Sequence, residues 1–230
     1  MTFLELANSC KLNCGISGPD LTTTVGASGD MKRICSWIND AWTELQVSCD
    51  TFDFMRKTVT FNTVAGQNKY LVGALLDIPL TNFSVWRNDS FRQYLTSAGV
   101  ATEIILGQYY DYAEYRDFYL LGSRKLVEGR PLYVTIEPQT RALVFGFIPN
   151  DVYTTSAEYF CLPQILAADT DVPTMPPRYH MAIVYSVMQK YGMFEMANEQ
   201  IMAGKKGYDF LYNRLLNDYA PIIQATGNFI

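Results

Sequence analysis

Apolar residues recur at helical spacing between Gly29 and Ser48. They fall three or four positions apart, and most polar side chains take the opposite face. Asp30 is placed to cap the N-terminus of such a helix. The pattern predicts an amphipathic helix in a bundle, with Trp37 beside the apolar stripe, where it widens the buried face or meets a partner. The apolar stripe comprises Met31, Ile34, Cys35, Ile38, Ala41, Trp42 and Leu45, and the polar face comprises Lys32, Arg33, Asn39, Asp40, Glu44 and Gln46.

Three further stretches have helical spacing, one near the start of the chain and two near its end. Residues 2–13 begin with Thr2 and carry Glu5 three positions later, which is the arrangement of a capping box. Residues 179–192 form an amphipathic pattern, and a second pattern runs from about residue 195 to residue 219. Gly204 and Gly207 lie within the last pattern and weaken the prediction of one continuous helix.

Between residues 57 and 162 the period changes to the alternation that is typical of strands. The segment KTVTFNTV alternates apolar and polar residues, and Asn88 and Asp89 predict a hairpin between two later strands. Residues 109–121 break the alternation and predict a short helix. The further strand candidates are KYLV, FSVWRND, FRQYLTS, LYVTIEP, RALVFGFIP and SAEYFCLP.

The order of these patterns predicts an α+β fold, with a helical bundle formed by the N- and C-terminal segments and an inserted antiparallel β-rich domain. The expected divisions are residues 1–56 for the N-terminal helices, 57–162 for the insertion, 163–218 for a linker and the C-terminal helices, and 219–230 for an apolar tail. The linker is rich in proline and is expected to run over the surface in an extended form.

Composition and charge narrow the function classes. Hydrophobic residues make up 49% of the chain, which supports a sizeable core. No apolar run reaches the roughly 18 residues that span a bilayer, the N-terminal segment does not have the pattern of a secretory signal, and no membrane partner is expected. A net charge of −5 disfavours sequence-independent binding of duplex DNA over a broad surface.

The five cysteines follow no disulfide framework and indicate a reducing compartment. Cys10 and Cys14 are four residues apart on a predicted helix, so both could reach one zinc ion. No second pair of ligands or nearby histidine completes a tetrahedral site. Core packing is the favoured interpretation, and neither a metal nor a cofactor is expected.

The sequence contains no phosphate-binding glycine loop, nucleophile elbow or zinc-protease motif. His180 is the only histidine, and capping or packing is favoured over catalysis. Asp111 and Glu114 lie on a predicted exposed helix face, so we interpret them as solvated acids rather than as a catalytic pair. Glu103 and Glu137 are single acids without a visible partner. We therefore expect no enzymatic activity and name no catalytic residue, although a hydrolase assembled from residues distant in the sequence is left open.

Aromatic residues cluster between positions 109 and 119. Core packing and an interaction surface explain the cluster equally well, and stacking on single-stranded bases is a third interpretation. Lys205 and Lys206 belong either to a solvated turn or to a surface that faces DNA or an acidic partner. The alternative function is thus a nucleic-acid-binding module that uses this cluster and the lysine pair. The aromatic residues are Tyr109, Tyr110, Tyr112, Tyr115, Phe118 and Tyr119.

Five stretches at the helical ends of the sequence form a recognisable set: the opening MTFLELANSCKLNCGISG, SGDMKRICSWINDAWTELQ with its WINDAW core, FDFMRK, PPRYHMAIVYSVMQKYG and the apolar tail. In these stretches the sequence resembles the phage head-to-tail adaptor, or connector, proteins, which in podophages are called tail tubular protein A or gatekeeper. The β-rich middle matches only in general character.

This resemblance implies a structural protein of the virion neck that is made in the host cytoplasm. Such adaptors form a ring, commonly of twelve copies, beneath the portal protein and around the channel through which genomic DNA passes without sequence-specific binding. They also meet a tail protein of the nozzle or tail-tube type. Candidate contacts between copies are Trp37, Tyr109, Tyr112 and Tyr115, and the implied portal-docking tail comprises Tyr219, Pro221, Ile222, Ile223, Phe229 and Ile230. From the residues alone, an apolar tail that folds back on its own domain is the alternative to docking on another subunit or partner.

Overall fold

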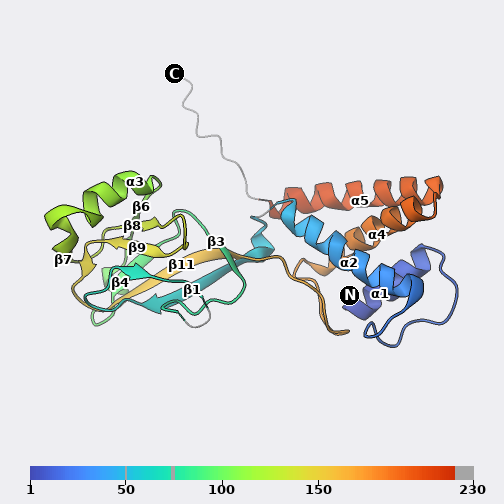
Figure 1. Ribbon diagram of the computed structural model, residues 1–230, viewed down its shortest axis with the longest axis horizontal. Helices are drawn as coiled ribbons and strands as arrows, with labels where there is room; N and C mark the ends of the chain where they lie inside the picture. Colours follow the sequence, from blue (N-terminus) through green and yellow to red (C-terminus); the bar gives the residue numbers. More distant parts are fainter. Residues whose placement is uncertain (50, 74–75, 221–230) are drawn as a thin grey trace, which may run out of the picture. The chain divides into compact units, whose positions relative to one another are not determined.

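The computed structural model describes residues 1–49, 51–73 and 76–220. The described chain divides into two compact units (Figure 1). The helical unit comprises Met1–Met55 and the described residues from Pro163 onward, and the sheet unit comprises Arg56–Leu162. Helices and mixed sheets are both present, so the predicted α+β class is confirmed.

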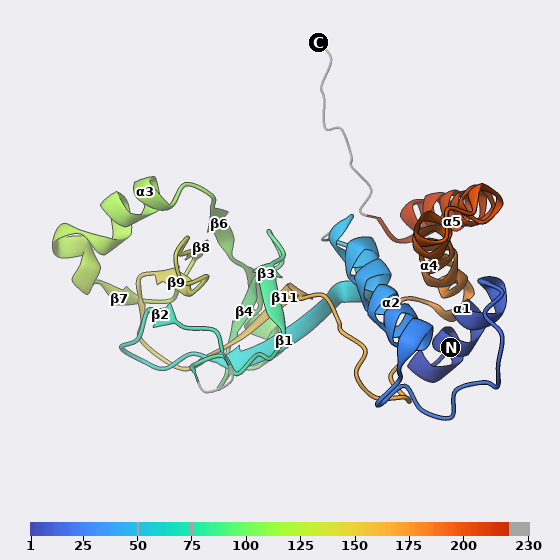
Figure 2. The same ribbon diagram turned by 45° about the vertical axis from the view of Figure 1, so that its right-hand side comes forward.

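The helical unit is a bundle in which α2 and α1 pack against α4, and α4 packs against α5 (Figure 2). The helices predicted from the sequence pattern are confirmed, with small shifts of their ends. The first begins as expected, because Thr2 and Glu5 form the two reciprocal hydrogen bonds of a capping box. The elements of this unit are α1 (Phe3–Asn13), α2 (Gly29–Val47), η1 (Asp53–Met55), η5 (Pro177–Tyr179), α4 (Met181–Phe194) and α5 (Asn198–Tyr219).

The polar pattern of α2 differs from the prediction at two positions. Ser28 occupies the N-cap position, so the prediction that Asp30 caps the helix is wrong. Asp30 lies in the first turn instead, where its carboxylate pairs with Arg33 at 2.8 Å. Gln46 was predicted on the solvent face but is buried, because its side-chain amide binds the backbone of Gln164.

The linker that precedes η5 is partly buried, which contradicts the expectation of a run over the surface. Leu166 and Met175 are each only 1% exposed. Asn39 of α2 donates to the Leu166 carbonyl oxygen at 2.9 Å and accepts from its amide at 2.8 Å. The Asp169 carboxylate accepts hydrogen bonds from the amide and the hydroxyl of Thr24. The linker can be buried because polar groups of the helical unit satisfy its backbone.

Two glycines allow α4 and α5 to lie close together (Figures 1 and 2). A Cβ atom at Gly204 would lie 2.8 Å from the Tyr185 carbonyl oxygen, and a Cβ atom at Gly207 would lie 2.7 Å from the Tyr185 ring. α5 is nevertheless one continuous helix. These glycines therefore serve the contact between the helices and do not interrupt α5.

The sheet unit consists mainly of two small sheets around an aromatic core. The 5-stranded sheet has the order β1-β11-β4-β5, with β3 also paired to β11, and the 4-stranded sheet has the order β2-β9-β8-β6. All pairs of the 5-stranded sheet are antiparallel, as expected. The 4-stranded sheet is mixed, because β6 and β8 are parallel, and the small sheet of β7 and β10 is parallel. The strands are β1 (Arg56–Asn62), β2 (Lys69–Tyr70), β3 (Phe83–Trp86), β4 (Arg92–Leu95), β5 (Ile104–Ile105), β6 (Gly107–Tyr109), β7 (Glu128–Gly129), β8 (Tyr133–Ile136), β9 (Leu143–Gly146), β10 (Ile148–Pro149) and β11 (Tyr153–Cys161).

The helical segment predicted over residues 109–121 begins later than expected, because Tyr109 belongs to β6. Asp111 caps the segment by accepting hydrogen bonds from the Ala113 amide at 2.8 Å and the Glu114 amide at 3.3 Å. Asp111 is thus a helix cap rather than only a solvated acid. The helical elements of this unit are η2 (Val100–Thr102), α3 (Tyr112–Tyr115), the π-helix η3 (Arg116–Leu120) and η4 (Gly122–Leu126).

The hairpin predicted at Asn88 and Asp89 does not form. Instead of pairing with each other, β3 and β4 both pair with β11, β3 at Tyr159–Cys161 and β4 at Tyr153–Ser156. The two strands therefore follow one another along the same edge of β11, and residues 87–91 form a loop between them. The length of β11 explains the difference, because it offers pairing positions to both strands.

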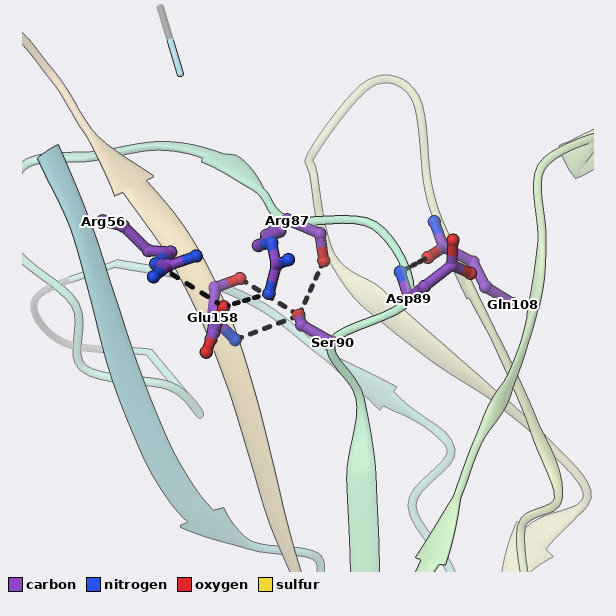
Figure 3. A network of polar contacts seen from close by, with 6 residues as sticks. All are labelled: Arg56, Arg87, Asp89, Ser90, Gln108 and Glu158. Carbon is purple, nitrogen blue, oxygen red and sulfur yellow. Dashed lines mark hydrogen bonds and ion pairs between the residues drawn. The ribbon is translucent and has the colours of Figure 1, made fainter. Parts of the chain in front are cut away.

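Polar contacts fix this loop to β11 (Figure 3). The Ser90 hydroxyl accepts from the Glu158 amide at 3.1 Å and donates to the Arg87 carbonyl oxygen at 2.6 Å. The Arg87 guanidinium pairs with the Glu158 carboxylate at 2.6 Å, and Arg56 lies 3.8 Å from the same carboxylate. The serine hydroxyl thus supplies an acceptor for β11 at the point where strand pairing is interrupted.

Candidate functional site

Trp37 lies on α2 against the end of α4. Its ring packs edge-on against Tyr191 at 6.5 Å and Phe194 at 6.1 Å, and the side chain is half-buried. The Arg33 guanidinium lies 3.9 Å from the centre of the Phe194 ring. Trp37 is therefore anchored within its own unit with part of its surface exposed, and its role in contacts between copies stays a prediction.

Large apolar side chains that the sequence interpretation did not single out are exposed at the end of α4, at the start of α5 and in the turn between them. Met193 is 60% exposed, Phe194 50%, Met196 89% and Met202 68%, and we call these residues the corner patch. Flexible methionines are common on surfaces that bind other proteins, and clustered exposed apolar residues are typical of interaction sites. The concentration of methionine around a predicted helix end was the sequence signal for this patch.

The aromatic cluster divides into a buried part and an exposed part. Tyr115 is fully buried, and its hydroxyl donates to the Val144 carbonyl oxygen at 2.9 Å. The assignment of Tyr115 to a contact between copies is therefore wrong, because this residue belongs to the core of the sheet unit. Burial raises the pKa of Tyr115, and burial together with the neighbouring tyrosines raises the pKa of Tyr119 to about 12.

The exposed part surrounds an open pocket of about 440 Å³, which we call the tyrosine pocket. Tyr110 is 66% exposed and donates to the Asp89 carboxylate at 2.5 Å. Tyr112 is half-buried, with its hydroxyl 3.5 Å from the Glu137 carboxylate. Of the predicted interface tyrosines, Tyr109 lines this pocket and Tyr112 does not. The pocket is lined by Gly107, Gln108, Tyr109, Tyr110, Asp111, Glu114 and Tyr133.

Lys205 and Lys206 are exposed on α5, in the helical unit, whereas the aromatic cluster lies in the sheet unit. Two rings of the cluster, Tyr115 and Tyr119, are buried and cannot stack on bases. The nearest arginine in the sequence, Arg116, pairs with the neighbouring Asp117 at 2.7 Å. Burial of the Tyr115 and Tyr119 rings leaves fewer aromatic faces for base stacking than the sequence suggested.

The predicted portal-docking tail begins at the end of α5. The Tyr219 ring lies 6.2 Å from Phe54 and 6.0 Å from Tyr179, and its hydroxyl accepts from Arg178 at 3.2 Å. These contacts hold the end of the helix against the bundle. The other predicted tail residues, Pro221, Ile222, Ile223, Phe229 and Ile230, lie outside the described residues.

The single acids have partners, contrary to the sequence interpretation. Glu103 lies 3.5 Å from Arg92, and Glu137 pairs with Lys69 at 2.7 Å. Hydrogen bonds from Lys69 and then Thr140 hold the pKa of Glu137 below its usual value. Both acids thus have structural roles in ion pairs.

His180 is buried, and its Nε2 atom lies 2.9 Å from the Met175 carbonyl oxygen. Burial lowers the pKa of this imidazole, so packing, one of the roles favoured for it, is confirmed. Cys10 and Cys14 are buried free thiols, which confirms that they pack in the core. Within residues 1–49, 51–73 and 76–220, no group of three or more His, Cys, Asp or Glu side chains is arranged to hold a metal ion.

None of the helices in the described part of the chain is long and apolar enough to cross a membrane. A family model described as the SU10 adaptor protein matches residues 1–228. No curated protein matches the sequence. The family match extends over both units and includes the β-rich middle, which the sequence resemblance did not cover.

Proposed function

The chain belongs to the SU10 adaptor protein family, and we propose that it joins the portal to the tail in the neck of a bacteriophage particle. The family makes it a structural phage adaptor that binds other virion proteins. The match over residues 1–228 is the observation that carries the proposal. The proposal includes a likeness to the podophage tail tubular protein A. It names the portal and the nozzle or tail-tube protein as partners. It also places the protein in the neck of the particle after synthesis in the host cytoplasm.

In this function, copies of the chain form a ring, with twelve as the proposed number. A ring is built by contacts between two different surfaces of the subunit. The corner patch supports such contacts, because it exposes large apolar side chains where the closely packed helices α4 and α5 meet. Trp37 adjoins it through Phe194, and Tyr109 and Tyr112 remain candidates on the sheet unit.

The ring surrounds the channel through which genomic DNA passes. The net charge of −5 supports this arrangement, because an acidic protein does not bind the DNA backbone over a broad surface and lets it slide. No sequence-specific contact with DNA is part of the proposal. If Lys205 and Lys206 face the DNA, they form a small basic site on a protein whose net charge is otherwise acidic.

The C-terminal tail docks on the portal in this function. The apolar residues Ile222, Ile223, Phe229 and Ile230 support the assignment, because apolar side chains gain most from burial in a partner. Tyr219 belongs to the helix that carries the tail.

Removing residues 221–230 tests the tail assignment. The shortened chain is expected to fold, because it keeps the contacts of Tyr219 with Phe54 and Tyr179 that hold α5 against the bundle, and it is expected to lose binding to the portal of the same phage. A matched pair of full-length variants refines the test. One replaces Ile222, Ile223, Phe229 and Ile230 with serine, and the control replaces the polar Gln224 and Thr226 with serine. Light scattering after size exclusion should show portal complexes only for the control, and equal binding by both would overturn the assignment.

A further inference from the structure

The tyrosine pocket has aromatic walls that depend on a glycine. The Tyr133 ring packs against Tyr109 with the ring centres 5.4 Å apart and the planes at 77°. A Cβ atom at Gly107 would lie 2.7 Å from the Tyr133 ring. The absence of a side chain at Gly107 therefore lets Tyr133 lie across β6, where it forms one wall of the pocket.

A second wall is fixed by the loop between β3 and β4. Gln108 accepts from the Asp89 amide at 2.7 Å and donates to the Asn88 side chain at 2.8 Å (Figure 3 shows Asp89 and Gln108). Tyr110 is tied to the same loop through the Asp89 carboxylate. Because Ser90 holds this loop on β11, the pocket is formed before any ligand arrives.

The rim of the pocket is acidic and has no counter-charge of its own. Asp111 and Glu114 line it, and Asp89 binds the Tyr110 hydroxyl at its edge. Within the described residues, none of these three carboxylates forms an ion pair with Lys, Arg or His at 4 Å or less. Aromatic faces and carboxylates both attract a cation, so the pocket fits a lysine or arginine side chain.

Lys205 and Lys206 are a matching pair of cations on α5. Of the adjacent basic pairs in the chain, three contain an arginine that is already bound: Arg33 to Asp30, Arg56 to Glu158 and Arg124 over Phe118. In the fourth pair, Lys205 and Lys206 are both exposed on α5, and neither forms an ion pair within the part of the chain that the structure describes.

We propose that the tyrosine pocket of one copy receives the Lys205–Lys206 side chains of a second copy. The inference rests on the proposed ring, because a head-to-tail contact joins two different surfaces of the same chain. It assigns those surfaces to an aromatic, acidic pocket on the sheet unit and a basic helix face on the helical unit. The lysine pair then contacts a neighbouring subunit instead of DNA.

A charge exchange in the full-length chain tests the pairing. Self-association, alone and on the portal, is measured by mass photometry for Glu114→Lys, for Lys205→Glu with Lys206→Glu, and for the combined variant. Each charge reversal is expected to weaken association by about tenfold or more, and the combination should restore most of it. Circular dichroism confirms folding, since Glu114 and both lysines are exposed. The control pairs Glu128→Lys with Lys125→Glu, two exposed positions outside both the pocket and the corner patch, and should change association little.

Cross-linking supplies an independent readout. A carbodiimide joins lysine amines to nearby carboxylates, and a mixture of ¹⁴N- and ¹⁵N-labelled chains separates links between copies from links within one. Mixed-isotope peptides that join Lys205 or Lys206 to Asp111 or Glu114 are expected. The pairing would be overturned, and the ring left intact, if the wild-type chain associates but the combined variant shows no rescue and these peptides are not found. A wild-type chain that never self-associates, even on the portal, would overturn both the ring and the pairing.

Discussion

The side-chain amide of Gln46 binds the backbone of Gln164 through two hydrogen bonds. Gln46 Nε2 donates to the Gln164 carbonyl oxygen at 3.0 Å, and the Gln164 amide donates to Gln46 Oε1 at 2.7 Å. Asn39 binds Leu166 in the same way, two turns earlier on α2. A side-chain amide presents a donor and an acceptor side by side, so each satisfies both backbone groups of one linker residue that has no strand partner.

Replacing Gln46 with leucine removes both bonds and leaves two buried backbone groups of Gln164 without these partners. We expect Gln46→Leu to lower the free energy of unfolding by about 2–4 kcal/mol. Urea denaturation measures the change. Asp40→Asn, at an exposed position of the same helix, is the control and should stay within about 0.5 kcal/mol of wild type. Similar losses in the two variants would show that the paired bonds contribute little.

The helical spacing in the sequence was sufficient to predict the bundle but not the burial of Gln46. Periodicity assigns polar residues to solvent, and the backbone groups that this amide satisfies lie more than a hundred residues later in the chain. The false hairpin at Asn88 and Asp89 has a related cause. A turn signal predicts pairing between neighbouring strands, whereas the length of β11 brings both strands to one edge, which only the assembled sheet determines.

The loop between β3 and β4 depends on the Ser90 hydroxyl. Ser90→Ala removes the acceptor of the Glu158 amide in the middle of β11. We expect a loss of about 1–2 kcal/mol in the free energy of unfolding, together with faster hydrogen exchange at that amide. The control is Thr60→Ala, because Thr60 is exposed on β1, an edge strand of the same sheet. An unchanged exchange rate at Glu158 in Ser90→Ala would contradict the role of the hydroxyl.

Gly204 sets the approach of α4 and α5. Alanine at this position brings a Cβ atom within 2.8 Å of the Tyr185 carbonyl oxygen and 3.1 Å of the Gln189 backbone nitrogen, neither of which can rotate away. Although alanine favours a helix over glycine by about 1 kcal/mol, we expect Gly204→Ala to cost about 1–3 kcal/mol in thermal or urea unfolding. Gly207→Ala should cost less, because its neighbour is the Tyr185 ring. Stabilisation by Gly204→Ala would disprove the close contact.

Substitutions of the two tryptophans of α2 should have different effects, one on the stability of the subunit and the other on association between copies. Trp42 is fully buried and stacks on Phe54 with the ring centres 6.2 Å apart, so Trp42→Ala should cost about 3–5 kcal/mol of stability. Trp37 is half-buried at the corner patch, and Trp37→Ala is expected to weaken association between copies more than it lowers the unfolding midpoint. Equal stability losses in the isolated subunits would show that Trp37 is only a core residue.

The candidate site was less predictable than the fold because residue type alone does not determine exposure. The same run of tyrosines contains Tyr115, which is fully buried, and Tyr110, which is 66% exposed. Short helical elements have no long period from which a buried face can be read. The acidic rim of the tyrosine pocket was also hidden, since Asp89 joins it through a loop whose path depends on β11.

His180 should make stability depend on pH. Its pKa is lowered in the folded protein because burial disfavours the charged imidazole, so the unfolded chain binds the proton more readily. The contribution of neutral His180 to the free energy of unfolding is therefore complete above the unfolded pKa of about 6.5. It is lost as the pH falls below that value, by at most about 1.4 kcal/mol per pH unit for one proton. Asp169 and Asp171 also have lowered pKa values, through hydrogen bonds from Thr24 and from the amides of residues 167 and 168, but they titrate at lower pH.

Urea unfolding of wild type and His180→Gln between pH 7.5 and pH 5 separates this histidine from the carboxylates. We expect the wild-type free energy of unfolding to fall over this range and the variant to show a flatter profile, even if glutamine costs stability at every pH. The imidazole is the only one in the chain, and the N-terminal amine lies 2.7 Å from its Nδ1 atom, so the difference in slope reports on His180 together with this amine. Parallel profiles would mean that the pKa of His180 is the same in the folded and the unfolded chain, and that burial does not lower it.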